Sequence, residues 1–265
     1  MSTRAAQYTA DVLRREQLSS HFVRLVLGGP GLAGFTSTGV PDEWVALTVP
    51  GQFQTRYYTV RSATPDEIVL DVVVHAEGLV TGWASGDCVG YEVGISVPKG
   101  SFTLPDDARW LLLVADLTGL PALARIHEWV AAHAPGLAPT SYVEAPKGTA
   151  EAYPDLPADA DIRWLEPPGE GDSALAEVVR GIGWPEGPGY FWMAGESAQM
   201  RDIRRHLRHE VGFTSGAFDV MGYWSGARGR RARAVDPGPI YARGRREGKT
   251  DEQIWADYDT ARDSG

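Results

Sequence analysis

The stretch Arg56-Tyr57-Tyr58-Thr59-Val60-Arg61 decides how the rest of the chain is interpreted. It has the residue types of an extended strand, in which alternate side chains face opposite ways. The two faces carry Arg56, Tyr58 and Val60, and Tyr57, Thr59 and Arg61. An aromatic ring, a hydroxyl and a fork-shaped cation at this spacing suit a flavin nucleotide. An aromatic-rich strand with two solvated arginines is the alternative.

Length and composition place the chain among globular proteins. Of its 265 residues, 43% are hydrophobic and 23% charged, which is enough core for one large or two ordinary domains. No apolar run has the length of a membrane span, so we expect a cytoplasmic protein without membrane insertion. The single cysteine, Cys88, excludes an internal disulfide and a thiolate-bound iron–sulfur cluster. If the protein does redox chemistry, an organic cofactor must carry the electrons.

The net charge of −10 is distributed unevenly. Residues 224–250 hold eight basic and two acidic side chains, a local charge of +6 that leaves −16 on the rest of the chain. This balance argues against nucleic-acid binding. The basic segment could attract an anionic small molecule, with Arg228 and Lys249 as candidate residues, and a solvated linker is the alternative.

Residues 1–105 predict short strands separated by turns. Apolar and polar side chains alternate, and glycine or proline punctuates the gaps. The expected strands are Tyr8–Leu13, His21–Leu27, Trp44–Val49, Arg56–Arg61, Glu67–His75 and Val89–Val93. Successive strands of this kind favour an antiparallel barrel or sandwich.

Residues 106–228 predict strands that alternate with helices. The expected strands are Arg109–Val114, Thr140–Glu144, Ile162–Leu165, Tyr190–Met193 and Ala217–Val220, and the expected helices are Pro121–Ala132, Ser173–Arg180 and Ala198–Val211. This order implies a parallel sheet with right-handed crossovers. Residues 229–265 then form a basic linker and a last helix, whose start has the capping-box spacing of Thr250 and Gln253.

Motifs in the first half resemble those of the siderophore-interacting protein family, within the ferredoxin-reductase superfamily. Arg56-x-Tyr58-Thr59 resembles its flavin motif, in which the arginine meets the FAD pyrophosphate and the tyrosine and threonine flank the isoalloxazine. Gly78–Ala84 resembles its second signature, where the FAD diphosphate lies, and Pro98–Phe102 its Gly-Pro-x-Gly-Ser-Phe at the end of the barrel. The implied FAD residues are Arg56, Tyr58, Thr59, Arg61, His75, Gly78, Val80, Thr81 and Trp83.

Motifs in the second half resemble the nicotinamide-binding part of the same family. Ala115–Ala122 is similar to Gly-Asp-Glu-Thr-Ala-Leu-Pro-Ala, with Leu117 in place of the glutamate. Trp192–Glu196 is similar to Trp-Val-Ala-Gly-Glu, and Gly222–Trp224 to a Gly-Tyr-Trp that usually precedes an arginine, here Ser225. The implied nicotinamide residues are Asp116, Thr118, Leu120, Pro121, Gly195 and Glu196, with Trp224 placed to cover the flavin or gate the nicotinamide.

The choice between NADPH and NADH stays open. Glu144 follows the second expected parallel strand, where a carboxylate can bond ribose hydroxyls and repel a 2′-phosphate. Lys147 could offset that repulsion.

The resemblance implies a six-stranded Greek-key FAD barrel followed by an NAD(P)-binding α/β domain, which together act as an NAD(P)H-dependent ferric-siderophore reductase. Hydride would pass from nicotinamide to FAD, and single electrons from the flavin to siderophore-bound Fe(III), releasing Fe(II). No acid–base residue or protein metal site is needed, and we expect a monomer. The alternatives are a reductase of quinones, free flavin or a carrier protein, or a siderophore-binding protein without redox activity.

Overall fold

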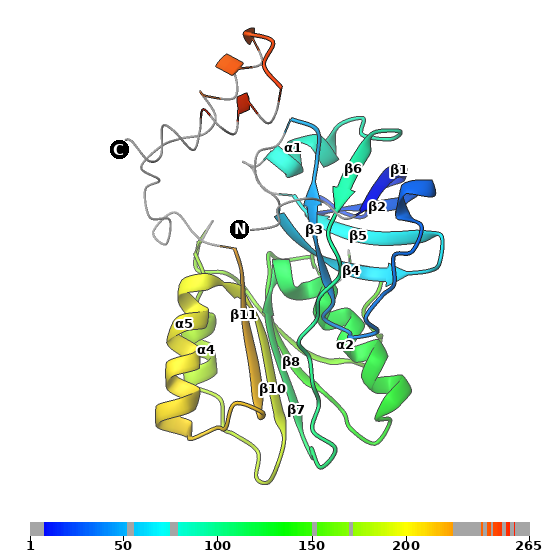
Figure 1. The fold of residues 1–265 in the computed structure, drawn as a ribbon. Helices are drawn as coiled ribbons and strands as arrows, with labels where there is room; N and C mark the ends of the chain where they lie inside the picture. Colours follow the sequence, from blue (N-terminus) through cyan, green and yellow to red (C-terminus); the bar gives the residue numbers. More distant parts are fainter. Residues whose placement is uncertain are drawn as a thin grey trace. The chain divides into compact units, whose positions relative to one another are not determined.

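The alternating first half of the chain forms a closed antiparallel barrel in the computed structural model (Figure 1). Its strands are β1 (Tyr8–Gln17), β2 (Phe22–Gly28), β3 (Trp44–Thr48), β4 (Arg56–Ala63), β5 (Glu67–Val73) and β6 (Glu92–Ile95). They follow the order β1-β2-β5-β4-β3-β6, and β1 pairs with β6 to close the barrel. A short helix, α1 (Leu79–Ser85), connects β5 to β6. The predicted Greek-key barrel is confirmed.

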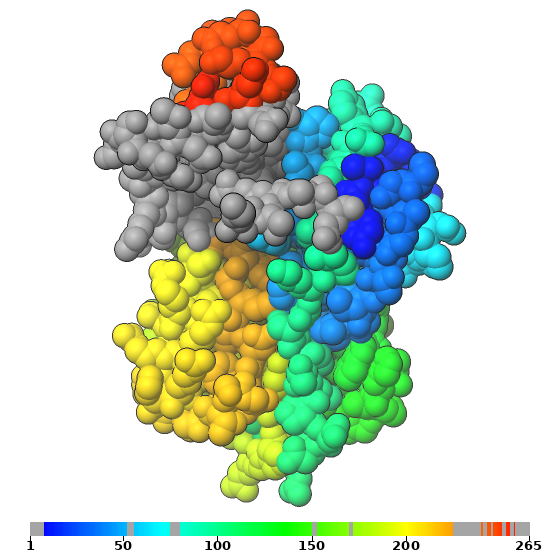
Figure 2. All heavy atoms as spheres, viewed as in Figure 1, coloured from blue at the N-terminus to red at the C-terminus, as the bar shows by residue number. Residues whose placement is uncertain are grey.

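The second half forms a five-stranded parallel sheet, as predicted. The strands are β7 (Leu111–Asp116), β8 (Thr140–Glu144), β9 (Asp161–Leu165), β10 (Tyr190–Glu196) and β11 (Phe218–Trp224), and the helices are α2 (Leu120–His133), α4 (Leu175–Arg180) and α5 (Ser197–His206). The strand order is β11-β10-β7-β8-β9. The helix α2 covers one face of the sheet, and α4 and α5 cover the other (Figure 1). In Figure 2 the segments of α5 and β11, yellow and orange, lie against each other.

The structure describes residues 8–51, 56–74, 79–149, 153–169, 172–224, 240, 243–244, 246–250, 253–254 and 257. By its contacts the chain divides into two compact units, Met1–Gly226 and Ala227–Gly265. The domain limits expected at residues 105 and 228 stay predictions. In the described ranges, no helix combines the length and apolar character that crossing a bilayer needs.

The side chains of β7 point alternately into two hydrophobic clusters, one on each face of the sheet. Leu113 and Ala115 belong to the hydrophobic cluster on the α2 face, whereas Leu112 and Val114 belong to the cluster under α4 and α5. The α2 cluster also contains Phe22 of β2 and Val73 of β5. The barrel, which has a hydrophobic cluster of its own, therefore also contributes side chains to the α2-face cluster of the sheet, and each large side chain buried there contributes about 2 kcal/mol.

Apart from Thr140–Glu144, the elements differ by a few residues from their predicted limits, and two of these differences have a clear backbone cause. The sixth strand was expected at Val89–Val93 but begins at Glu92, because Gly90 adopts a left-handed φ of 84° that interrupts the extended run. The helix expected to reach Val211 ends at His206 and continues as a π-helical turn, Leu207–Val211. Gly212 stops it with a φ of 84°.

The second unit contains the predicted capping box. The Thr250 backbone N–H donates to Gln253 Oε1 at 3.0 Å, and the Gln253 N–H donates to Thr250 Oγ1 at 3.3 Å. The two reciprocal bonds satisfy N–H groups that the start of a helix leaves unpaired.

Candidate functional site

Strand β4 carries the Arg-x-Tyr-Thr residues. Arg56 is exposed at the start of the strand, Tyr58 is half-buried against the barrel core, and Thr59 is buried. Burial raises the pKa of Tyr58 to about 12, although the positive charge of Arg56 opposes the shift. The Tyr58 phenol therefore stays protonated at neutral pH and can donate a hydrogen bond.

Two buried hydroxyls lie near each other where the barrel meets the sheet. Thr59 on β4 is 5% exposed. Burial raises the pKa of Tyr223 on β11, and the nearby Thr59 hydroxyl opposes that shift. Among the residues that the structure describes, neither hydroxyl oxygen has a partner at hydrogen-bond geometry. Buried polar groups without partners are rare in native proteins, so this pair indicates a place for a polar ligand atom.

Asp116 organises the carboxyl end of the sheet. Its Oδ1 accepts bonds from the Thr118 N–H at 2.8 Å and the Thr118 hydroxyl at 2.5 Å, and its Oδ2 accepts one from the Trp224 indole at 2.5 Å. Burial raises the pKa of Asp116, and the bonds from Thr118 and Trp224 counteract it. Three residues expected in one site are thus brought together at the edge where open sheets bind nucleotides.

Gly195 and Glu196 lie beside Asp116 at the end of β10. A Cβ on residue 195 would lie 2.8 Å from Asp116 Oδ2, so only glycine fits there. Glu196 caps α5, because its Oε2 accepts the N–H groups of Ala198 and Gln199 at 2.7 and 3.0 Å. These contacts give both residues a structural reason to be present next to the candidate site.

Leu120 and Pro121 of the nicotinamide set, and Glu144, which was considered for the choice between NADPH and NADH, are also buried. Leu120 is 0% exposed, and Pro121 is buried with it in the first turn of α2. Glu144 is 4% exposed, and its Oε1 accepts the Ala174 N–H at 2.8 Å just before α4. Burial raises the pKa of Glu144, and the bond from Ala174 opposes that shift.

The residues of the second signature are only partly described. Val80 lies in the barrel core, and the Thr81 hydroxyl donates to the Val73 carbonyl at 3.2 Å. Trp83 is half-buried, and its indole nitrogen has no hydrogen-bond partner among the described residues. His75 and Gly78 lie outside the described residues.

Arg61 and the basic segment have partners other than a nucleotide. Arg61 is 7% exposed and forms ion pairs with Glu128 and Asp155. Lys249 pairs with Asp257 at 2.8 Å and with Glu247 at 3.0 Å. Arg228 and Ser225 lie outside the described residues.

The sequence did not single out every residue of this site. Tyr223 was quoted only as part of a motif, and its burial beside Thr59 depends on the meeting of two distant strands. Arg125 and Glu128 on α2 both contact β4, and their spacing of three residues on an otherwise apolar helix is a signal that could have found them.

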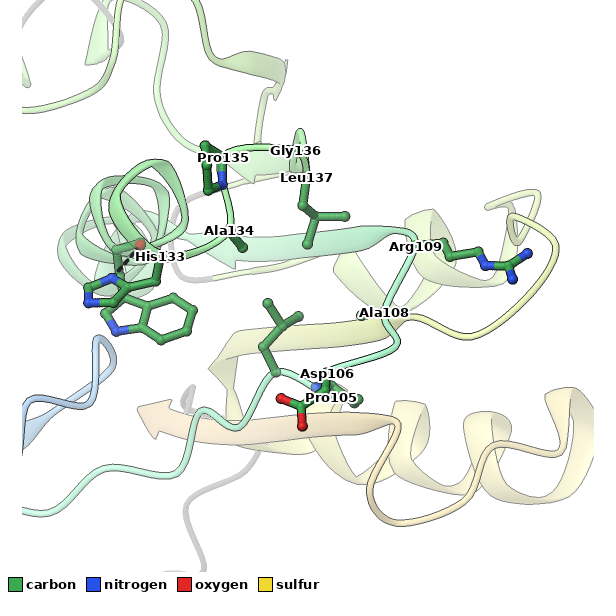
Figure 3. Close-up of a pocket in the computed structure, with 11 residues that line it drawn as sticks. Pro105, Asp106, Ala108, Arg109, His133, Ala134, Pro135, Gly136 and Leu137 are labelled. Atoms are coloured by element: carbon green, nitrogen blue, oxygen red, sulfur yellow. Dashed lines mark hydrogen bonds between the residues drawn. The ribbon is translucent and has the colours of Figure 1, made fainter.

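A hollow of about 400 Å³ lies at the opposite end of the sheet (Figure 3). Its lining consists of residues 104–106, 108 and 109, which precede β7, and of Trp129 and residues 133–137 at and after the end of α2. His133 stacks on the Trp129 ring, with 4.6 Å between ring centres. Since this edge carries the amino ends of the strands, the hollow is distinct from the site around Asp116.

No group of three or more potential metal-binding side chains is found within the described ranges.

A closed Greek-key barrel followed by a parallel sheet, with the barrel strand β4 facing the carboxyl edge of that sheet, is the architecture of the ferredoxin-reductase superfamily. The family model for siderophore-interacting proteins matches residues 108–227. These residues cover the whole parallel sheet and the Asp116 site.

Known proteins of similar sequence and structure agree with that match. The chain is 27% identical to an NADPH-dependent ferric-chelate reductase of Escherichia coli, over 75% of this chain and 85% of that protein. It is 26% identical to the ferric vibriobactin reductase ViuB of Vibrio cholerae, over 84% and 90%. A siderophore utilization protein from T. fusca has the same fold, with a TM-score of 0.68, 26% identity and coverage of 86% and 94%. The resemblance to the siderophore-interacting protein family is thereby confirmed.

Proposed function

We propose that this chain is an NAD(P)H-dependent ferric-siderophore reductase that holds FAD between its barrel and the carboxyl edge of its sheet. Two relatives are named for the reduction of ferric chelates, and each is matched over most of its length. A bound flavin would supply the step from a two-electron donor to a one-electron acceptor. The siderophore-bound Fe(III) is the substrate.

The pair of unpartnered hydroxyls carries the proposal. Thr59 comes from the barrel and Tyr223 from the parallel sheet, and both hydroxyls are buried with no protein partner at hydrogen-bond geometry in the described part of the chain. A flavin ring presents carbonyl and nitrogen atoms that such hydroxyls can bond. Thr59 is also the residue that the Arg-x-Tyr-Thr motif assigns to the isoalloxazine, so the motif and the unpartnered hydroxyl both support the proposal.

The chain's own residues would bind and orient the cofactor from β4 and α1. The Arg56 guanidinium would meet the pyrophosphate, while Tyr58 and Thr59 would flank the ring. The turn before α1 would hold the diphosphate. The residues assigned to the diphosphate from that turn and from α1 are His75, Gly78, Val80, Thr81 and Trp83.

The nicotinamide would bind at the carboxyl edge of the sheet. The turn Leu117–Gly119 follows Asp116 directly, and the bonds from Thr118 and Trp224 hold the carboxylate in place. The residues assigned there are Asp116, Thr118, Leu120, Pro121, Glu144, Gly195, Glu196 and Trp224. In the second unit, Arg228 and Lys249 would attract an anionic siderophore. The chain would act as a cytoplasmic monomer.

Anaerobic spectroscopy tests the function. Purified protein loaded with FAD is mixed with NADPH or NADH, and the flavin absorbance is followed. We expect bleaching by the nicotinamide and return of the colour when a ferric siderophore is added. The faster of the two initial rates identifies the donor. Protein that gains no flavin absorbance when FAD is added would contradict the proposal.

A redox-inactive siderophore-binding protein is the second candidate. Leu117 stands where the family has a glutamate, and its side chain packs against the α2 cluster. Under this alternative, ferric siderophore binds but the flavin is never bleached. Faster recolouring by quinones than by ferric siderophores would instead indicate another reductase of the superfamily.

A further inference from the structure

The helix α2 connects the nucleotide turn directly to the flavin strand. It begins at Leu120, immediately after the turn Leu117–Gly119. Arg125, on its second turn, donates from Nη1 to the Val60 carbonyl at 2.6 Å. One turn later, Glu128 Oε2 accepts a bond from Arg61 Nη1 at 2.9 Å, and the other carboxylate oxygen of Glu128 also accepts a bond from Arg61. These hydrogen bonds thus join α2 to Val60 and Arg61, the two residues that follow Thr59 on β4.

A second layer of ion pairs surrounds this contact. Asp155, between β8 and β9, pairs with both Arg24 and Arg61, and its Oδ2 lies 3.3 Å from Arg61 Nε. Arg24 also makes two bonds to Asp71, at 2.7 and 2.8 Å. The Tyr153 hydroxyl donates to Asp71 at 2.7 Å. We call the contacts of Arg61, Arg125, Glu128 and Asp155 across the junction the interdomain clasp.

The ion pair between Arg61 and Glu128 in the clasp has a defined geometry as well as opposite charges. Burial lowers the pKa of Arg61, but the bonds that Arg61 donates to Glu128, together with the charges of Glu128 and Asp155 and the effect of Tyr153, raise it overall. A carboxylate that meets a guanidinium through two bonds fixes both position and angle. A register shift in the pairing of β4 with β5 lies between Val60 and Ser62, where bulges commonly redirect a side chain. Arg61 reaches α2 from this point.

We propose that the interdomain clasp sets the separation between the flavin strand β4 and the nicotinamide turn Leu117–Gly119. The inference rests on the proposed function, and it makes Arg61 and Glu128 positioning residues. From Leu120 to Glu128, α2 rises about 12 Å, and it acts as a rigid spacer of that length. Because hydride transfer depends steeply on distance, releasing one end of the spacer slows the step without removing a ligand of the flavin.

Glu128→Arg is the variant that opens the clasp, because it opposes Arg61 with a like charge. Glu67→Arg is the matched control. Glu67 forms an equally bidentate pair with Arg14, at 3.0 and 2.7 Å, but both residues belong to the barrel. Glu128→Asp keeps the charge of the clasp and serves as the rescue.

Three measurements compare these variants. Flavin fluorescence quenching gives the FAD affinity, which we expect to stay within about twofold in all of them. Anaerobic stopped-flow absorbance gives the limiting rate of flavin reduction, which we expect to fall at least about tenfold in Glu128→Arg, to recover largely in Glu128→Asp and to stay unchanged in Glu67→Arg. Hydrogen exchange in the flavin-free protein should rise across residues 117–133 in Glu128→Arg alone.

Two results would overturn the inference: a limiting rate in Glu128→Arg within about twofold of the unaltered protein, or an equal loss in Glu67→Arg. The exchange measurement keeps this test separate from that of the proposed function. If the unaltered protein does not bind FAD, the proposed function fails. Hydrogen exchange across residues 117–133 would still show whether Glu128 holds α2 against the barrel. Unchanged exchange in Glu128→Arg would show that it does not.

Discussion

The junction between barrel and sheet has two regions that differ in how their buried polar groups are paired. At the interdomain clasp, charged side chains from β4, α2 and the segment before β9 meet one another. At the end of β11, the hydroxyls of Thr59 and Tyr223 are buried without partners among the described residues. A paired buried group stabilises the fold, whereas an unpaired one costs free energy until a ligand arrives. The contrast separates the residues that hold the domains from those that would hold the cofactor.

We expect the largest loss of unfolding free energy from a substitution in the network of paired charges. Asp71→Asn removes the charge that Arg24 and Tyr153 contact, and Arg24 keeps only Asp155 as its acidic partner. Breaking a buried ion pair typically costs 3–5 kcal/mol, and we expect about 3 kcal/mol because one partner remains. Urea unfolding measures it. A loss below about 1 kcal/mol would place this network among surface ion pairs.

Trp224→Phe tests the carboxyl edge of the sheet. The change removes the indole donor to Asp116, and a bond to a charged group contributes about 2 kcal/mol. The pKa of Asp116 is raised in the folded protein, so its contribution to stability is greatest at low pH and is lost as the pH rises through the folded pKa. Without the indole that pKa rises further.

The destabilisation by Trp224→Phe should therefore be larger near about pH 7 than near about pH 4. Unfolding free energies at both pH values provide the measurement. An equal loss at the two values would mean that the indole bond does not stabilise the charged form of Asp116.

Tyr223→Phe tests the region of the unpartnered hydroxyls, and it should raise the stability of the flavin-free protein instead of lowering it. Removing a buried hydroxyl that has no partner relieves its desolvation, so the flavin-free protein should gain about 1 kcal/mol of stability. Thermal unfolding without FAD measures the change. A clear loss of stability would show that the hydroxyl already has a protein partner.

Glu67→Gln should have the smallest effect, because its pair with Arg14 is exposed. The bonds from Arg14 lower the pKa of Glu67. A carboxyl with a lowered folded pKa stabilises the protein above its unfolded pKa, and that contribution is lost as the pH falls through the folded value. The small difference between variant and parent should therefore vanish in acid, and denaturant titration at two pH values checks this.

Local patterns predicted the architecture but not the contacts across the junction. Alternation located the barrel strands, and the change to strand and helix located the parallel sheet, because both depend on side chains close in sequence. Motif order led to Asp116, Thr118 and Trp224, which the structure brings together. Tyr223 was not assigned a role, since its burial depends on how two distant strands meet.

Arg61 shows that alternation of side chains can predict a strand correctly without predicting the partner of one of its residues. Alternation places it on the face of Thr59, and it was predicted to belong to the FAD-binding residues. In the structure Thr59, Val60 and Arg61 are all buried in succession, and the register shifts beside them. Its acidic partners Glu128 and Asp155 lie 67 and more residues away, where no local periodicity can reveal them.

The FAD affinity of Thr59→Val tests the central claim most directly. Valine keeps the shape of the buried side chain and removes the unpartnered hydroxyl, so the flavin-free fold should be at least as stable as before. If that hydroxyl is present to bond a flavin, fluorescence titration should show FAD binding about tenfold more weakly than to the parent protein. Equal FAD affinity in the two proteins would contradict the account.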